Sequence, residues 1–303
     1  MRLLRRTVTR GSVAMLVMGA SLTLLPPAFG QAPPYYPPAE LERLVSRIAL
    51  YPDALLAQVL AAATFPDQIP DAAGWADAHH YLRDESLARA IEQDRLPWDP
   101  SVQALLPFPS VLGMMASDMN WTSELGNAFL AQPQEVMDAV QRMRHRAWEY
   151  GYLRSNPQIV VRTGPYIEIV PANPAFVCVP VYDPVIVYAR PRPGFFVGGA
   201  INFGFGITMG AAFRPWGWGG GNRFAWNQHT VIINNNRWDR TYVNRRTYVH
   251  PSPVQRYEAP RPAERHELRE RTPAEREAPL RGRPRVEEHE RGRGREQERE
   301  HRR

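Results

Sequence analysis

The residues that could hold a metal ion gather around two adjacent histidines, His79 and His80. Asp71, Asp77 and Asp84 lie near them in the sequence, and imidazole together with carboxylate suits several divalent ions. Adjacent residues on a helix point about 100 degrees apart, so one helix face cannot present both histidines, unlike the four-residue spacing of helical zinc motifs. The spacing therefore favours surface or capping histidines, and we predict no metal site.

Signatures of a nucleophile or a cofactor site are weak. Cys178 is the single cysteine, and it lies between Val177 and Val179 in an apolar pattern that predicts a small buried residue. The sequence has no G-x-S-x-G elbow, and Gly204-Phe205-Gly206 lacks the third glycine and the following helix of a dinucleotide-binding loop. We therefore predict no catalytic residue and no cofactor.

The N-terminus has the order of a cleavable secretory signal. Four arginines among the first ten residues precede an apolar segment over residues 12–25, and Ala28 and Gly30 are small residues placed for cleavage. The apolar segment is shorter than the roughly 20 residues that a spanning helix needs. We predict a signal peptide over residues 1–30, cleavage near Gly30, and an exported protein in the periplasm or at the cell surface.

Composition divides the rest of the chain into five regions. We predict a Pro-rich leader over 31–38, a helical domain over 39–157, a small β subdomain over 158–190, a Gly/Trp/Asn-rich β-hairpin region over 191–250 and a disordered Arg/Glu-rich tail over 251–303. The predicted fold class is therefore α+β: an N-terminal bundle of short α-helices, then a small antiparallel β region, then a disordered charged C-terminal tail.

Apolar residues recur at helical spacing through the first of these domains. Prolines punctuate the pattern, which predicts a bundle of short helices. The expected segments are 41–48, 55–63, 72–82, 86–93, 101–106, 111–119, 123–131 and 133–151. Short runs of branched and aromatic residues then predict strands over 159–162, 166–170, 176–181 and 185–188.

A charge-free run over residues 193–213 is rich in glycine and phenylalanine. Its odd positions from Ile201 to Phe213 are bulky and apolar, apart from one alanine, while the even positions are mostly glycine or small residues. This period of two favours a strand that forms a hairpin with residues 230–234. Glycines four apart leave a helix open as the alternative, at a cost of roughly 1 kcal/mol for each interior glycine.

Neither the composition of the tail nor the net charge of the chain indicates a particular binding partner. Residues 251–303 contain 15 arginines and 12 glutamates and almost no apolar residue, so they cannot bury a core. The formal net charge is +6, and four of the arginines belong to the predicted signal peptide. The remaining chain is close to balanced, so we expect no nucleic-acid binding.

Several strings resemble one bacterial family. Residues 41–60 read LERLVSRIALYPDALLAQVL, and Pro171-Ala172-Asn173-Pro174 and residues 179–184 (VPVYDP) follow in the β region. Together these strings resemble the exported bacterial family of the domain of unknown function numbered three thousand three hundred, over roughly residues 41–188. The resemblance implies an export signal and a Gly/Trp/Asn-rich region after the domain, and it implies no known activity.

We expect a noncatalytic envelope protein with a structural or interaction role. The predicted interaction surface is aromatic, because aromatic faces can stack on sugars or lie at a membrane interface. Its residues are Phe203, Phe205, Trp216, Trp218, Trp226 and Trp238. The expected partner is an envelope component or a second copy of the chain, with peripheral membrane contact as a further role. Packing within the sheet is the other explanation for these aromatic residues.

The alternative function is an envelope hydrolase that acts on cell-wall polymer or glycan. Its site would lie between the helical domain and the sheet.

Overall fold

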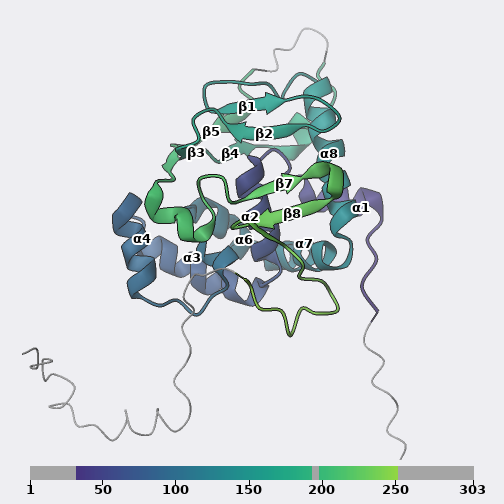
Figure 1. Cartoon of the computed structure of the whole chain (residues 1–303). Helices are drawn as coiled ribbons and strands as arrows, with labels where there is room; N and C mark the ends of the chain where they lie inside the picture. The colour runs from purple at the N-terminus through teal and green to yellow at the C-terminus, as the bar shows by residue number, and fades with distance from the viewer. Residues whose placement is uncertain (1–31, 193–197, 252–303) are drawn as a thin grey trace, which may run out of the picture.

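The structure is a computed structural model that describes residues 32–192 and 198–251. Helices fill its N-terminal part and short antiparallel strands follow, which confirms the predicted α+β class (Figure 1). The predicted signal peptide and the predicted charged tail, except its first residue, lie outside the described residues. None of the described helices is long and apolar enough to cross a membrane.

Eight α-helices and one 3-10 helix make up the N-terminal part of the described chain. Proline occupies the first turn of most of them, where its missing N–H group costs no hydrogen bond. The elements are α1 Pro38–Val45, α2 Asp53–Ala63, η1 Pro66–Gln68, α3 Ile69–Ala78, α4 Asp84–Gln93, α5 Pro100–Gln103, α6 Pro109–Ser117, α7 Met119–Ala131 and α8 Pro133–Glu149.

Helix α2 lies at the centre of the bundle. Every residue of α2 except Ala54 is buried. Helix α7 approaches it closely at Gly126, where a Cβ atom would lie 1.9 Å from the carbonyl oxygen of Ala63. Residues 48–60, which read IALYPDALLAQVL, therefore form the turn before α2 and most of α2 itself.

The strands are short and pair antiparallel in small sheets. Strand β1 (Ile159–Arg162) pairs with β2 (Glu168–Pro171), β3 (Phe176–Val177) with β6 (Ile207–Thr208), and β4 (Pro180–Tyr182) with β5 (Ile201–Phe203). Strand β8 (Thr230–Ile233) lies between β7 (Arg223–Ala225) and β9 (Asn236–Arg237). The remaining elements are α9 Pro184–Val187, η2 Ala211–Trp216 and η3 Trp226–Gln228.

The strand expected over 185–188 is wrong, because Pro184–Val187 forms the short helix α9. Pro184 occupies the first turn, and the Asp183 side chain accepts a hydrogen bond from the backbone N–H of Val185 at 2.8 Å. A capping aspartate followed by proline starts a helix locally, and this outweighs the strand preference of the valine-rich run.

The expected hairpin between residues 201–213 and 230–234 does not form either. The first run divides into β5, β6 and η2, and its strands pair with β4 and β3. Residues 230–233 pair with β7 and β9. The break falls at Gly204-Phe205-Gly206, and a Cβ atom on Gly206 would lie 3.2 Å from the sulfur of Cys178. Close approach to Cys178 therefore explains a glycine at this bend.

One large hydrophobic core joins the helices to the Gly/Trp/Asn-rich region. Its buried members include Leu55 and Leu60 of α2 together with Trp216, Trp218 and Phe224. Figure 1 shows β7 and β8 lying across α2 in this view. A second, smaller core contains Leu50, Leu153 and Ile169 among others. The boundary predicted at residue 191 thus marks a change of composition, and the residues on its two sides share a core.

Candidate functional site

The structure separates the six aromatic residues of the predicted interaction surface. Trp216, Trp218, Trp226 and Trp238 are buried, with 2%, 3%, 4% and 8% of their surface exposed. Phe203 is partly buried against the smaller core. Phe205 is fully exposed, at 101%. The four indole rings are therefore core residues in this structure, and only Phe205 presents a large apolar surface to solvent.

Trp216 and Trp218, two of the buried tryptophans, hydrogen-bond to the helical part of the chain. The indole N–H of Trp216 donates to Oε1 of Gln103 at 3.1 Å, and that of Trp218 donates to the carbonyl oxygen of Ala104 at 3.1 Å. The amide of Gln58 on α2 donates to the carbonyl oxygen of Trp216 at 3.1 Å. These contacts fix the Gly/Trp loop onto the bundle, because a buried N–H without an acceptor would be costly.

Arg144 of α8 is fully buried at the junction of the helices and the sheet. Its Nε donates to the carbonyl oxygen of Ala49 at 2.8 Å, and Nη2 donates to that of Tyr51 at 3.0 Å. Nη1 donates to Oδ1 of Asp53 at 2.7 Å and to the carbonyl oxygen of Ile167 at 2.8 Å. The guanidinium thus joins the turn before α2 to the segment that leads into β2.

Asp53 extends the same network to the C-terminal strands. Its Oδ1 also accepts a bond from the backbone N–H of Ile169 at 3.3 Å, and its Oδ2 accepts one from the indole N–H of Trp226 at 3.0 Å. The guanidinium carbon of Arg144 lies 5.1 Å from the centre of the Trp226 ring. The string Tyr51-Pro52-Asp53 carries no sequence signal of these distant partners.

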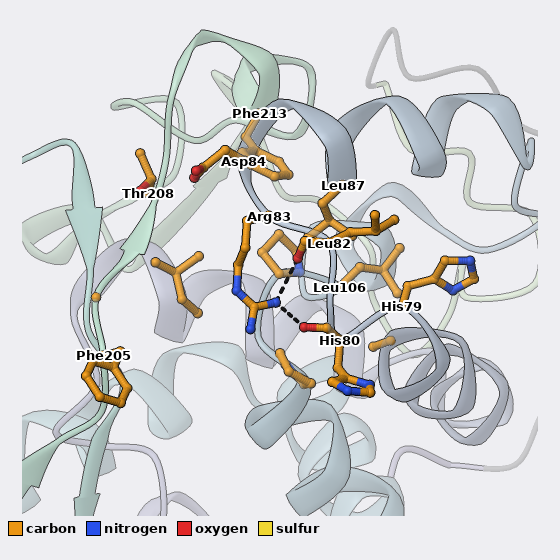
Figure 2. Close-up of a pocket in the computed structure, with 15 residues that line it drawn as sticks. His79, His80, Leu82, Arg83, Asp84, Leu87, Leu106, Phe205, Thr208 and Phe213 are labelled. Atoms are coloured by element: carbon orange, nitrogen blue, oxygen red, sulfur yellow. Dashed lines mark hydrogen bonds between the residues drawn. The ribbon is translucent and has the colours of Figure 1, made fainter.

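A pocket of about 280 Å³ opens beside Phe205, between helices α3 and α4 and strand β6. Figure 2 shows the Arg83 side chain between the strand segment that carries Phe205 and the turn that carries His80. Leu87, Leu106 and Phe213 are among the apolar lining residues. We call this cavity the histidine pocket, because His79 and His80 also line it.

The two histidines of the pocket contact backbone oxygen atoms. Nδ1 of His79 lies 2.8 Å from the carbonyl oxygen of Trp75, on whose ring it stacks at 4.0 Å between centroids. Nδ1 of His80 lies 2.6 Å from the carbonyl oxygen of Asp77. Among the described residues, no three His, Cys, Asp or Glu side chains gather in a group that could hold a metal ion. The histidines here close the end of α3.

The charged groups of the pocket are also held in place locally. Nη1 of Arg83 donates to the carbonyl oxygens of His80 and Leu82 (Figure 2). Ser86 receives a bond from the backbone N–H of Arg83 at 3.1 Å, which closes the first turn of α4. The pocket therefore combines an anchored cation and apolar walls with an exposed phenylalanine at its edge.

Cys178 lies under the Phe205 bend. It is buried, and burial raises the pKa of its thiol. A raised pKa disfavours the thiolate, which is the reactive form of cysteine. Cys178 acts here as a small apolar side chain that packs beneath Gly206.

Comparison with known proteins places the chain in a family without naming an activity. It is similar to the uncharacterized protein YacH of Escherichia coli strain K12, at 33% identity over 240 residues. That match covers 61% of this chain and 38% of YacH, so the chain spans well under half of that relative. No solved structure matches the chain. The family described as "Protein of unknown function (DUF3300)" matches residues 37–258, more than half of the chain, and the chain therefore belongs to this bacterial family.

Proposed function

We propose that the protein is an exported, noncatalytic interaction protein of the cell envelope, and that Phe205 is the centre of its contact surface. The single observation that carries the proposal is the full exposure of Phe205 beside the histidine pocket. The partner we propose is a protein that inserts an apolar side chain between Phe205 and the pocket walls.

The surroundings of Phe205 extend the apolar surface. Phe176 on the neighbouring strand is 42% exposed. A Cβ atom on Gly206, the residue after Phe205, would lie 3.5 Å from that of Phe176. We call Phe205 and the adjoining mouth of the histidine pocket the Phe205 patch. Apolar surface of this kind next to a cavity is typical of interaction sites. A central aromatic anchor with a rim of charged groups, such as Arg83 and Asp84, is a common arrangement at protein interfaces.

The alternative, an envelope hydrolase, has weaker support. Hydrolysis of a glycan commonly uses two carboxyl groups that face one cleft. Asp53 lies at the junction where such a site was expected, but its two oxygen atoms bind Arg144, Ile169 and Trp226. A carboxylate held by three donors serves the fold better than it serves proton transfer.

The contact surface can be tested with two substitutions of exposed apolar residues. Phe205→Ser removes the aromatic anchor, and Val243→Ser, at a residue 89% exposed elsewhere, is the matched control. We expect both variants to fold, as judged by circular dichroism. In cross-linked envelope extracts and in light scattering of the purified protein, Phe205→Ser should lose the partner band or the self-association seen with wild type and Val243→Ser.

Two outcomes contradict the contact surface. One is equal behaviour of the two variants. The other is flotation of wild type with lipid vesicles in the absence of any protein partner, abolished by Phe205→Ser, which would make the Phe205 patch a membrane contact. A turnover of cell-wall polymer by the purified protein would contradict the noncatalytic role.

Export can be tested separately from binding. We propose cleavage near Gly30, because small residues precede that point after a basic and then an apolar segment. Mass spectrometry of protein recovered from the periplasm and from the medium should give a chain that begins near Gln31. A full-length chain that remains in the cytoplasm contradicts the proposal.

A further inference from the structure

A second pocket, of about 420 Å³, opens on the sheet side of the molecule and shares no lining residue with the histidine pocket. Strand β2, strand β7 and the loop at Gly219 and Gly220 line it, and the start of α2 is also part of its wall. We call it the arginine pocket, because Arg162 and Arg223 both line it. It is independent of the Phe205 patch.

The charges of the arginine pocket do not cancel. Four of its lining residues are ionisable: Asp53, Arg162, Glu168 and Arg223. Asp53 is compensated by the buried Arg144 at 2.7 Å. Glu168 is then the one acid to set against two arginines, and it lies 3.8 Å from Arg162 with both side chains well exposed. A pair with this geometry is weak, so the pocket keeps a net positive charge.

Arg223 has only neutral acceptors. Its Nη1 lies 3.3 Å from the carbonyl oxygen of Gly220 and 3.4 Å from Oδ1 of Asn235, both long hydrogen bonds. Within residues 32–192 and 198–251, no carboxylate forms an ion pair with it. An arginine fork without an acid is a natural partner for a carboxylate or phosphate group.

The loop at Gly219 and Gly220 contributes backbone atoms that no side chain covers to the wall of the same pocket. Gly219 and Gly220 have φ values of +89° and +113°, and a Cβ atom on either would meet nothing within 4 Å. Neither backbone N–H has an acceptor in the described part of the chain. Backbone N–H groups in a turn can donate hydrogen bonds to an anion. A side chain at these φ values would be strained, which explains why glycine stands here.

The remaining walls are apolar. Ile169, Val177, Met209, Trp218 and Phe224 line the pocket, and each is less than 9% exposed. A small inorganic anion would leave these walls in contact with water. A ligand with an apolar body would cover them, which stabilises the complex in proportion to the apolar area removed from water.

We propose that the arginine pocket binds an anionic amphiphile, a molecule with one carboxylate or phosphate group and an apolar body. The anionic group contacts Arg162, Arg223 and the N–H groups of Gly219 and Gly220. The apolar body lies against Trp218, Phe224 and Met209. The shared chemistry covers a fatty acid and an alkyl phosphate, and the two are separated by experiment.

The test uses isothermal titration calorimetry of the mature chain below the critical micelle concentration of each probe. The probes are decanoate, decyl phosphate, uncharged decyl maltoside and inorganic phosphate. We expect decanoate or decyl phosphate to bind, with an affinity that falls as salt is raised. The stronger of the two identifies the headgroup. Decyl maltoside and inorganic phosphate should each bind at least about tenfold more weakly, because each lacks one half of the recognition.

Variants locate the binding. The double variant Arg162→Gln and Arg223→Gln should weaken binding of the anionic probe at least about tenfold, because it removes two charge-assisted contacts. Arg237→Gln is the control, because Arg237 is an exposed arginine on strand β9 of the same sheet as β7 and does not line this pocket. Phe205→Ser should bind the probe as wild type does, even if it loses its protein partner.

The inference is overturned by any of five results. The uncharged probe binds as tightly as the anionic probes; inorganic phosphate alone binds as tightly as decyl phosphate; the double variant keeps wild-type affinity; or Arg237→Gln weakens binding as much as the double variant does. Absence of binding by both anionic probes also overturns it.

Discussion

The helical region and the Gly/Trp/Asn-rich region are held in place by different kinds of contact. The helices pack through apolar faces that repeat along each helix, as around the almost entirely buried α2. The later region is held by irregularly spaced aromatic side chains that join the helical core, and single hydrogen bonds to distant helical residues, such as that from Trp218 to Ala104, fix their orientation. The difference shows that a segment without a repeating apolar pattern can still adopt one position in the fold, because the residues that hold it lie elsewhere in the chain.

The buried Asp53–Arg144 pair lies in the helical region, and Asp53 also accepts the hydrogen bond from Trp226 of the later region, so breaking the pair should have the largest effect. Arg144→Met leaves Asp53 buried without its counter-charge, and we expect a loss of about 3–5 kcal/mol in the free energy of unfolding. Urea unfolding followed by tryptophan fluorescence measures it. Arg142→Met removes an exposed partner of Glu42 and should cost about 0–1 kcal/mol.

A second substitution separates the explanations for Arg144. The double variant Asp53→Asn and Arg144→Met removes both charges, so it should be more stable than Arg144→Met alone. Equal losses for Arg142→Met and Arg144→Met would show that the buried pair stabilises the fold no more than an exposed pair does.

Helix packing alone is probed by glycine substitutions within the helical region. Gly126→Ala places a Cβ atom 1.9 Å from the carbonyl oxygen of Ala63, so α2 and α7 must move apart. We expect a loss of about 1–3 kcal/mol in the free energy of unfolding. Gly113→Ala meets no atom within 4 Å and should stabilise α6 by up to about 1 kcal/mol. Thermal unfolding of both variants measures these changes in stability. Stabilisation by Gly126→Ala would contradict the close approach of α7 to α2 at Gly126.

The docking of the later region is probed at Trp226. Trp226→Phe keeps most of the ring but removes the N–H that Oδ2 of Asp53 accepts. We expect a loss of about 1–3 kcal/mol, and a drop in amide-exchange protection that is larger in β7 and β8 than in α2. Trp148→Phe, at a residue 38% exposed on α8, should change neither. Uniform loss of protection would mean that the two regions unfold together.

Alkaline pH should have the smallest effect of these changes: it leaves stability unchanged near neutral pH and lowers it gradually at higher pH. Burial raises the pKa of Tyr51 to about 12, and burial also raises the pKa of Tyr182 and Tyr188 above the ordinary range. The folded state therefore prefers the neutral phenol. This contribution to stability is complete below about pH 10, where a tyrosine ionises in the unfolded chain, and it is lost as the pH rises toward 12.

Melting temperatures between pH 8 and pH 12 measure this loss. Tyr51→Phe should flatten the decrease, whereas Tyr35→Phe, at a residue 75% exposed, should leave it as in wild type. Tyrosine ionisation near pH 10 in the folded protein, seen by ultraviolet absorption at the buried positions, would contradict the burial of these phenols.

Local patterns predicted the helices well and the strands only in part. Proline and apolar spacing located all eight α-helices of the bundle to within a few residues, because both signals act within one or two turns. The strands over 159–162 and 230–233 were also located. The pairing was not, since the choice of β4 and β3 as partners for β5 and β6 depends on residues some 20 to 30 positions away.

The candidate sites were predicted less well than the fold. Phe205 was singled out for its place in a glycine-rich run, and it is exposed. The four tryptophans beside it in that prediction are buried, because they pack in the core that the later region shares with the helices, which no local pattern describes. Arg162 and Arg223 carried no signal, because a pocket that joins β1 to β7 exists only after the chain has folded.

The sequence by itself determined the α+β class, the family and the place of the helical bundle before the strands, since these depend on composition, short spacing and one long specific string. The tertiary structure alone decided which groups lie inside. Asp53, Arg144 and Trp226 are far apart in the chain and meet because a buried charge needs its counter-charge and a buried N–H needs an acceptor. These partners are brought together by the folded chain, so their spacing in the sequence does not reveal them.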